Sequence, residues 1–218
     1  MSIPRFAPRT EQLPSASQPS TPAQRQRYAT LIAEAKSLLE SGGDDALQMK
    51  ELSRRTGVAL STIYRYFPSK QWLILAVAVH RRRELAADPS RILFHEGKAS
   101  ERVAGFLLEN QRREHTEQSL IEAVRGAGYV ASRDIRDVIE QLRDEFLQHL
   151  ITDAGPFSAD QLPILDLIIE VADQVSSRSS AGFLTAREAR FRLLMICELL
   201  DLSPEHISEI ATSAVTAR

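Results

Sequence analysis

The sequence predicts an all-α fold, in which an N-terminal helix-turn-helix domain is followed by a larger helical domain. Three observations support this prediction. Apolar residues recur at intervals of three and four along most of the chain. No segment has the alternating pattern of a convincing β-strand. Turn-forming residues fall between the helical patterns rather than within hairpins. We expect three parts, over residues 1–21, 22–68 and 69–218.

Residues 1–21 are rich in Pro, Ser, Gln and Thr and have no periodic apolar residues, which is typical of a disordered arm. The first helix is expected to begin after Thr21, which can cap it, with Pro22 in its first turn. Gly42 and Gly43 are expected to stop it.

Two short helices follow, at about 49–56 and 60–67, and then a longer one from Ser69 to about Ala87, where Asp88 and Pro89 end it. The remaining apolar periodicity predicts further helices near 99–112, 116–127, 132–152, 159–179 and 185–201.

The composition excludes several classes of protein. Cys197 is the only cysteine, so the chain has no disulfide framework, and no Cys/His cluster has the spacing of a structural zinc site. We therefore expect no cofactor or metal. The longest apolar run, from Trp72 to Val79, is too short to span a bilayer, and the N-terminus does not resemble a signal peptide. These features favour a cytoplasmic protein.

The net charge of -2 is divided unevenly along the chain. Residues 1–90 contain 13 Lys and Arg against 8 Asp and Glu, whereas residues 91–218 contain 14 against 21. This asymmetry favours a basic module that meets a polyanion and an acidic module that does not, although mild differences between halves are common.

Residues 49–67, MKELSRRTGVALSTIYRYF, have the spacing of a helix-turn-helix. Ser53 is small where two helices would touch, and Gly57 lies where a tight turn requires a positive φ. The spacing by itself is weak, because a small residue followed four positions later by Gly is frequent in helical hairpins.

Each residue of a helix advances about 100° around the axis, which assigns faces to the last helix of this motif. Leu60, Ile63 and Phe67 share the inward side. Ser61 and Arg65 point away from it, Thr62 and Tyr64 lie on the flanks, and Tyr66 lies at an edge. Arginine can bind guanine with two hydrogen bonds, and Tyr and Ser can contact bases or phosphates, so the outward face suits a DNA major groove.

The helix that follows begins with Ser69, a good N-cap, and Lys70, so its first N–H groups could accept a phosphate. Gln48 and Lys50 could hold the DNA backbone on the other side of the motif. Two alternatives remain open. Tyr66 could belong to the core, and the run Arg81-Arg82-Arg83 fits a solvated helix end that satisfies terminal carbonyls better than a DNA contact.

These residues resemble the TetR family of bacterial transcriptional regulators, whose motif is G-V-x-x-x-T-[LI]-Y-x-[HY]-F-x-[SN]-K. The resemblance covers about residues 22–75 and implies DNA binding by the first three helices, a linking fourth helix, and a C-terminal effector-binding and dimerisation domain. The matching positions are Gly57, Val58, Thr62, Ile63, Tyr64, Tyr66, Phe67, Ser69 and Lys70.

The resemblance implies that Lys50, Ser61, Tyr64 and Arg65 contact bases, and that Gln48, Thr62, Tyr66 and Lys70 contact phosphates. Leu60 departs from the family, since some members place a polar residue there. The segment YRYFPSK is also similar to regulators of lipid and sterol catabolism in actinobacteria, which suggests a small hydrophobic, acyl-like or sterol-like effector.

We expect a homodimer on a palindromic operator, released by the effector. The expected dimer surface consists of two stripes: Ile164, Leu165, Ile168, Val171, Ala172 and Val175, and Phe191, Leu194, Met195 and Leu199. Candidates for the effector pocket are Phe106, Leu107, Tyr129, Phe146 and His149. Either set could instead face the core of its own domain, and His149 could be a hydrogen-bonded core histidine.

The sequence leaves three alternative functions. An enzyme is not favoured, because the sequence has no Gly-rich phosphate loop, no G-x-S-x-G and no paired metal-ligand motif. An architectural DNA-binding protein would need a broad basic surface. A regulator without an effector would use its C-terminal domain only to dimerise.

Overall fold

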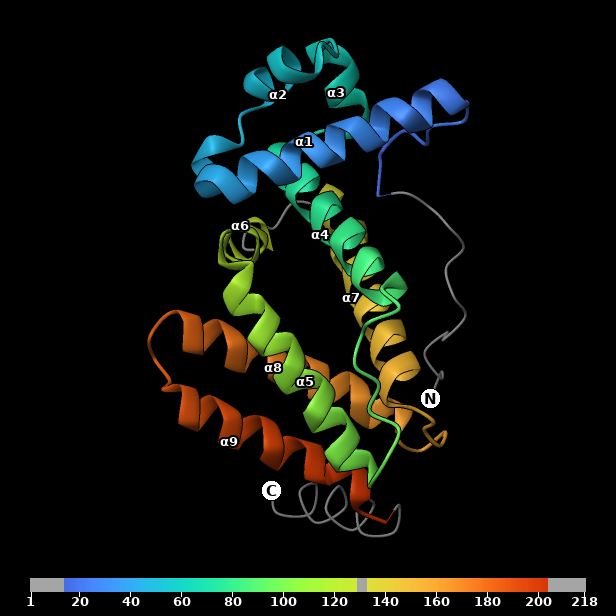
Figure 1. Cartoon of the computed structure of the whole chain (residues 1–218), viewed down its shortest axis with the longest axis vertical. Coiled ribbons are helices and arrows are strands. Elements are labelled where there is room, and N and C mark those ends of the chain that lie inside the picture. Colours follow the sequence, from blue (N-terminus) through green and yellow to red (C-terminus); the bar gives the residue numbers. More distant parts are fainter. Residues whose placement is uncertain (1–13, 129–132, 204–218) are drawn as a thin grey trace. The chain divides into compact units, whose positions relative to one another are not determined.

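The computed structural model describes residues 14–128 and 133–203, and these residues form helices and loops with no β-strand (Figure 1). The predicted all-α fold is confirmed. The helices are α1 (Pro22–Ala46), α2 (Met49–Thr56), α3 (Leu60–Tyr66), α4 (Lys70–Ala87), α5 (Ala99–Thr116), α6 (Gln118–Gly128), α7 (Arg133–Ala154), α8 (Leu162–Ser180), α9 (Ala186–Cys197) and the short 3-10 helix η1 (Glu198–Asp201). No helix in the described ranges is both long and apolar enough to cross a membrane.

Helix boundaries follow the expected local signals. The Thr21 hydroxyl accepts a hydrogen bond from the Gln24 N–H at 3.2 Å, and the Gln24 side chain accepts one from the Thr21 N–H, which forms a capping box before Pro22. Near the other end of α1, Gly42 and Gly43 leave the helical conformation, and Gly43 has a φ of 65°. The regular helix is therefore broken where the two glycines predicted a stop.

Contacts divide the chain into two compact units. The N-terminal unit contains the described residues of 14–91 and 113–146, and the C-terminal unit contains 92–112 and 147–203. The boundary at residue 68 between the DNA-binding domain and the effector domain stays a prediction. The contacts group α4 and α6 with α1, α2 and α3 in one unit.

The N-terminal unit is organised around α1, which packs against α2, α4 and α6. Its core is a continuous apolar cluster that includes the inward face of α3 and most of the first three turns of α4. The largest fully buried side chains of this cluster are Tyr28, Tyr66, Phe67, Leu31, Leu38, Leu39, Leu47, Leu52, Ile63, Leu73 and Ile74.

In the C-terminal unit, α8 and α9 form a hairpin and lie side by side (Figure 1). Leu165 and Ile168 of α8 and Leu193 and Cys197 of α9 are buried within this unit. Cys197 is a core residue, and burial is the main reason why the pKa of its thiol rises to about 12.

The segment before α1 differs from the expected disordered arm. Residues 1–13 lie outside the described residues, but residues 14–21 have defined positions, and Pro14 and Pro19 are buried. The Pro14 carbonyl accepts hydrogen bonds from the Tyr28 hydroxyl and the Trp72 indole. Composition did not reveal these contacts, because their partners lie in α1 and α4.

Candidate nucleic-acid interface

The turn between α2 and α3 is built by one glycine and two hydroxyl side chains. Gly57 has φ 69° and ψ 6°, and its N–H donates to the Ser53 carbonyl at 2.9 Å, so the predicted positive φ is confirmed. The Ser53 hydroxyl donates to the Val58 carbonyl at 2.7 Å, and the Thr56 hydroxyl accepts from the Val58 N–H at 3.3 Å. These hydrogen bonds fix the direction in which the chain enters α3.

Helix α3 turns its apolar side to the core as the sequence predicted. Ile63 and Phe67 have no exposed surface, and Leu60 is half-buried against the same cluster. Leu60, where the chain departs from the TetR motif, therefore acts at least in part as a packing residue.

The opposite face of α3 is open to solvent. Ser61 and Arg65 are exposed, and Tyr64 keeps 45% of its surface accessible. A hydroxyl, a phenol and a guanidinium thus lie on one face, free of the core. This face can offer hydrogen bonds to base edges, with Arg65 as the strongest donor.

The start of α2 adds two exposed polar side chains near this motif. Lys50 is exposed in the first turn, and Gln48 precedes the helix as its N-cap residue without a side-chain cap bond. The Gln48 amide instead donates to the Asp45 carbonyl at 3.0 Å. Both side chains are accessible to a ligand, so their predicted DNA contacts stay predictions.

Among the residues predicted to contact phosphates, Thr62 is half-buried, whereas Tyr66 is only 1% exposed. The Tyr66 ring packs edge-on against Tyr28, with ring centroids 5.9 Å apart, and its hydroxyl is enclosed. A buried hydroxyl cannot reach a phosphate, so the structure contradicts this predicted role and favours the core alternative. Tyr66 lies only about 60° around the axis from Ile63, and Tyr28 fills the space beside it.

Lys70 is engaged with the chain itself. Its Nζ lies 2.6 Å from the Asp44 carbonyl oxygen and 3.0 Å from an Asp44 carboxylate oxygen. Beside it, Ser69 caps α4 by accepting a hydrogen bond from the Trp72 N–H at 3.1 Å, as predicted. Lys70, the first residue of α4, therefore joins the end of α1 to α4, and a phosphate would have to compete with Asp44 for its charge.

The positive charge of α2 is partly neutralised as well. Arg54 and Arg55 both donate to Glu51, and Arg55 also donates to Glu34 of α1 at 3.0 Å. Hydrogen bonds from these two guanidinium groups lower the pKa of Glu51 to about 2. Arg54 remains largely exposed, and sequence reasoning had assigned it no role.

The side chains of the Arg81-Arg82-Arg83 run are partly buried and contact other segments of the N-terminal unit, which differs from the solvated helix end that the sequence favoured. Arg81 donates to Glu117, before α6, and Arg83 donates to Glu145 of α7 at 2.6 and 2.8 Å. The Arg82 guanidinium lies 4.4 Å from the centre of the Phe146 ring. The three arginines thus tie α4 to neighbouring segments, a role that required knowledge of the packing partners.

The effector-pocket candidates are distributed over both units. Phe106, Leu107 and His149 are buried in the C-terminal unit, Phe146 belongs to the N-terminal unit, and Tyr129 lies outside the described residues. The rings of Phe106 and His149 meet edge to face with centroids 5.3 Å apart. His149 Nε2 lies 2.8 Å from a carboxylate oxygen of buried Asp153, a partner that sequence reasoning missed.

The two stripes expected to form the dimer surface differ in their exposure to solvent. Four residues of the α8 stripe are buried within their own unit, and Ile164, Val171 and Leu199 are partly exposed. In contrast, Phe191, Leu194 and Met195 on α9 are exposed, at 62%, 38% and 55%. The four buried residues are Leu165, Ile168, Ala172 and Val175.

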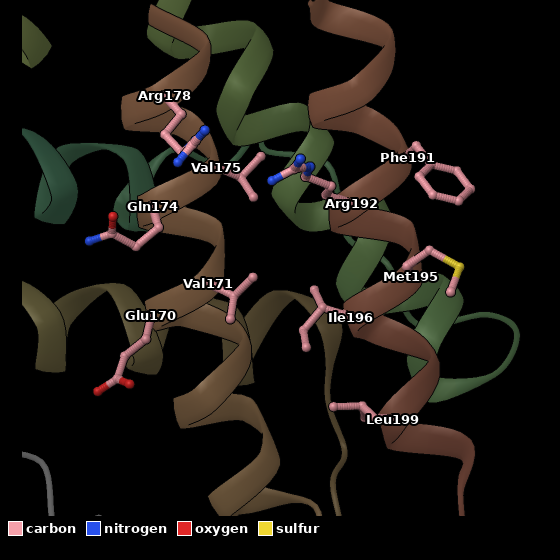
Figure 2. A pocket seen from close by; sticks show the side chains of 10 residues that line it. All are labelled: Glu170, Val171, Gln174, Val175, Arg178, Phe191, Arg192, Met195, Ile196 and Leu199. Atoms are coloured by element: carbon pink, nitrogen blue, oxygen red, sulfur yellow. The ribbon is translucent and has the colours of Figure 1, made fainter. Parts of the chain in front are cut away.

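A groove of about 710 Å³ runs between α8 and α9 (Figure 2). Val171 of α8 faces Ile196 of α9 across it, and Phe191 and Met195 lie on its α9 side. Charged side chains lie along its wall, with Arg178 at one end of the α8 side and Glu170 toward the other.

Comparison with known proteins places these features in context. Residues 31–77 match the family described as "Bacterial regulatory proteins, tetR family". The chain is 30% identical over 156 residues to the HTH-type transcriptional repressor KstR of Rhodococcus jostii (strain RHA1), which covers 70% of this chain and 72% of the relative. It is 27% identical over 160 residues to KstR of Mycolicibacterium smegmatis (strain ATCC 700084 / mc(2)155), which covers 72% and 78%.

Solved structures show the same fold. A TetR transcriptional regulator from Rhodococcus sp. RHA1 matches with a TM-score of 0.68 and 24% identity, over 84% of this chain and 100% of that one. The transcriptional regulator FadR from Bacillus subtilis, in complex with stearoyl-CoA, matches with a TM-score of 0.50 and 15% identity, over 79% of this chain and 97% of that one.

Proposed function

The chain belongs to the TetR family of bacterial regulatory proteins, and we propose that it is a cytoplasmic transcriptional repressor that binds operator DNA through α2 and α3. The observation that carries this proposal is the exposed face of α3. Ser61, Tyr64 and Arg65 project from a short helix whose other side is locked into the core, and the left-handed turn at Gly57 sets its direction. This arrangement suits insertion into a major groove.

The exposed side chains divide into two roles. Lys50, Ser61, Tyr64 and Arg65 contact base edges, where hydrogen-bond donors and acceptors differ between base pairs. Gln48, Thr62 and Lys70 contact phosphates, which fixes the position of the protein along the duplex. Tyr66 takes no part, since its hydroxyl is enclosed.

The repressor acts as a homodimer whose interface is the α8–α9 face. In support, Phe191, Leu194 and Met195 form an exposed apolar surface next to the groove, which is costly to leave in water. Two copies related by a two-fold axis would cover this surface and present two α3 helices to a palindrome. The buried residues of the α8 stripe support the hairpin from within.

An apolar, lipid-like effector would release the repressor from DNA. The support is chemical: Phe106 and Leu107 are apolar side chains in the interior of the C-terminal unit, and the buried His149–Asp153 pair places polar groups beside Phe106. The stearoyl-CoA bound to FadR, a protein with the same fold, and the resemblance to regulators of lipid catabolism favour this class of ligand.

The first experiment identifies the operator, because the DNA sequence that the protein prefers can be selected by binding. Full-length protein is used to select duplexes from a random 40-bp pool, and the enriched sequence is compared with a shuffled version by fluorescence anisotropy at one fixed salt concentration. A repressor should enrich a palindrome and bind it about a thousandfold or more tightly than the shuffled DNA. Equal affinity for both would instead favour an architectural DNA-binding protein.

The effector is tested on the same complex. Fatty acyl-CoA thioesters and sterols are added to protein bound to the selected duplex, and release of DNA is followed together with the thermal midpoint of the free protein. A ligand that stabilises the protein and releases the DNA supports regulation by an effector. No response to either class would favour a regulator without this type of effector.

A further inference from the structure

Helix α3 is too short to hold its own orientation. It has seven residues, and isolated helices shorter than about 12 residues are marginal in water. Its last carbonyls also need partners from outside the helix. Whatever contacts these carbonyls therefore helps to decide the angle at which Ser61, Tyr64 and Arg65 face a ligand.

Residues 14–16, which we call the strap, supply such a partner. The Ala16 N–H donates to the Tyr66 carbonyl at 2.9 Å, at the last residue of α3. The Ser15 hydroxyl also approaches this carbonyl, at 3.4 Å, and donates to the Ser17 carbonyl at 2.8 Å. The strap thus reaches the end of α3 although it lies far away in sequence.

The other end of the strap is anchored to two further helices. The Pro14 carbonyl accepts from the Tyr28 hydroxyl of α1 at 3.1 Å and from the Trp72 indole of α4 at 3.3 Å. Pro14 itself is buried. Burial is the main reason why the pKa of Tyr28 is raised, so its hydroxyl remains a donor at all physiological pH values. Tyr28 also packs against Tyr66 and Phe67, with ring centroids 5.9 and 5.3 Å apart.

We infer that the strap is a positioning element for sequence recognition: by joining α1 and α4 to the end of α3, it holds the exposed face of α3 at the angle that distinguishes one DNA sequence from another. The inference rests on the proposed function. The strap touches no base in this role. Its loss should lower the discrimination between DNA sequences more than the general affinity for DNA, because phosphate contacts tolerate small rotations and base contacts do not.

The test removes a single hydrogen-bond donor from the full chain. Ala16→Pro deletes the N–H that binds Tyr66, and the Ala16 side chain is exposed, so the new ring meets solvent. Ala16→Ser keeps the N–H and is the matched conservative variant. Both are measured against the selected palindrome and its shuffled version, and thermal unfolding reports whether the fold is intact.

We expect Ala16→Pro to lower the ratio of the two affinities about tenfold, while Ala16→Ser stays within about twofold of the unchanged protein. The affinity of Ala16→Pro for the shuffled DNA should be unchanged. An unaltered ratio, or equal weakening on both DNAs, would overturn the positioning role. If the unchanged protein enriches no sequence at all, the proposed function fails instead, which is a distinct result.

A pair of truncations tests the same inference without proline. Deleting residues 2–13 leaves the strap in place, and deleting residues 2–17 removes it. The longer deletion alone should lower discrimination, by about tenfold. The same loss in both truncations would place the effect in residues 2–13 and refute a role for the strap. If only one of the two variants, Ala16→Pro or the longer deletion, folds, its discrimination between the two DNAs decides whether the strap has a positioning role.

Discussion

Replacement of Arg65 by alanine tests the proposed DNA contact most directly, because the side chain contributes little to the fold. Arg65 is exposed, and its guanidinium carbon lies 5.5 Å from the centre of the Tyr66 ring. An exposed cation–π contact is worth at most about 1 kcal/mol. The free energy of unfolding should therefore fall by less than about 1 kcal/mol.

The expected cost to binding is larger. A bidentate contact between arginine and guanine contributes about 1–3 kcal/mol of discrimination, and a dimer makes the contact twice. The loss on the palindrome is then about 2–6 kcal/mol, a weakening between about 30-fold and about 20,000-fold. On shuffled DNA, the loss of one positive charge should cost much less, since non-specific binding depends on the whole set of phosphate contacts.

The assay is fluorescence anisotropy on both duplexes at one salt concentration, together with urea unfolding of each variant. Arg112→Ala is the matched control, because Arg112 on α5 carries the same charge, is 70% exposed and pairs with Glu109 within its own helix. It should leave both affinities unchanged. Equal weakening of Arg65→Ala on the two duplexes, or no weakening on either, would refute the base contact.

Three further predictions concern the turn, the core and the α8–α9 face. Gly57→Ala should lower the free energy of unfolding by about 1–2 kcal/mol in urea titration, because a φ of 69° is strained for alanine. Apart from the chain neighbours of Gly57, no atom of the described residues lies within 4 Å of the added Cβ, so the cost comes from the backbone. An unchanged stability would mean that the turn relaxes. Cys197 should not react with an aromatic disulfide reagent at pH 8 until the protein unfolds, since burial raises its pKa to about 12. Because the unfolded thiol ionises near 9 and the folded one only near 12, stability should fall as pH rises through this interval, a trend that Cys197→Ala should reduce. Phe191→Asp should give a monomeric mass in light scattering at micromolar concentration, whereas Phe183→Asp, in the loop outside the groove, should not; a dimer that persists in Phe191→Asp would exclude this face as the interface.

Much of the fold could be predicted because its signals are local. Thr21 and Ser69 cap their helices through hydrogen bonds to residues three positions later, and Gly57 ends α2 through its own backbone conformation. Such effects depend on a few neighbouring residues, so spacing in the sequence identifies them. The exposed and buried sides of α3 followed in the same way from the helical period and from one known apolar position, Ile63.

The site was predicted less completely, because several roles depend on distant parts of the chain. Tyr66 lies at the edge of its helical face, and the Tyr28 ring decides that it is buried rather than available to a phosphate. Lys70 of α4 binds Asp44 at the end of α1. In both cases the helical period predicts the direction in which the side chain points, but tertiary packing determines which residue it meets.

The sequence by itself determined the all-α fold, the helix-turn-helix and the outward face that carries Ser61 and Arg65, since these follow from periodicity, capping and one glycine conformation. Only the tertiary structure decided that Arg81 and its two neighbours join α4 to other segments, and that Pro14 holds α1 and α4 beside the end of α3. The physical reason is the separation in sequence between the residues that interact. A helix boundary is fixed by hydrogen bonds over three or four residues, whereas the partner of a long side chain or a buried carbonyl is fixed by which remote surfaces meet when the core forms.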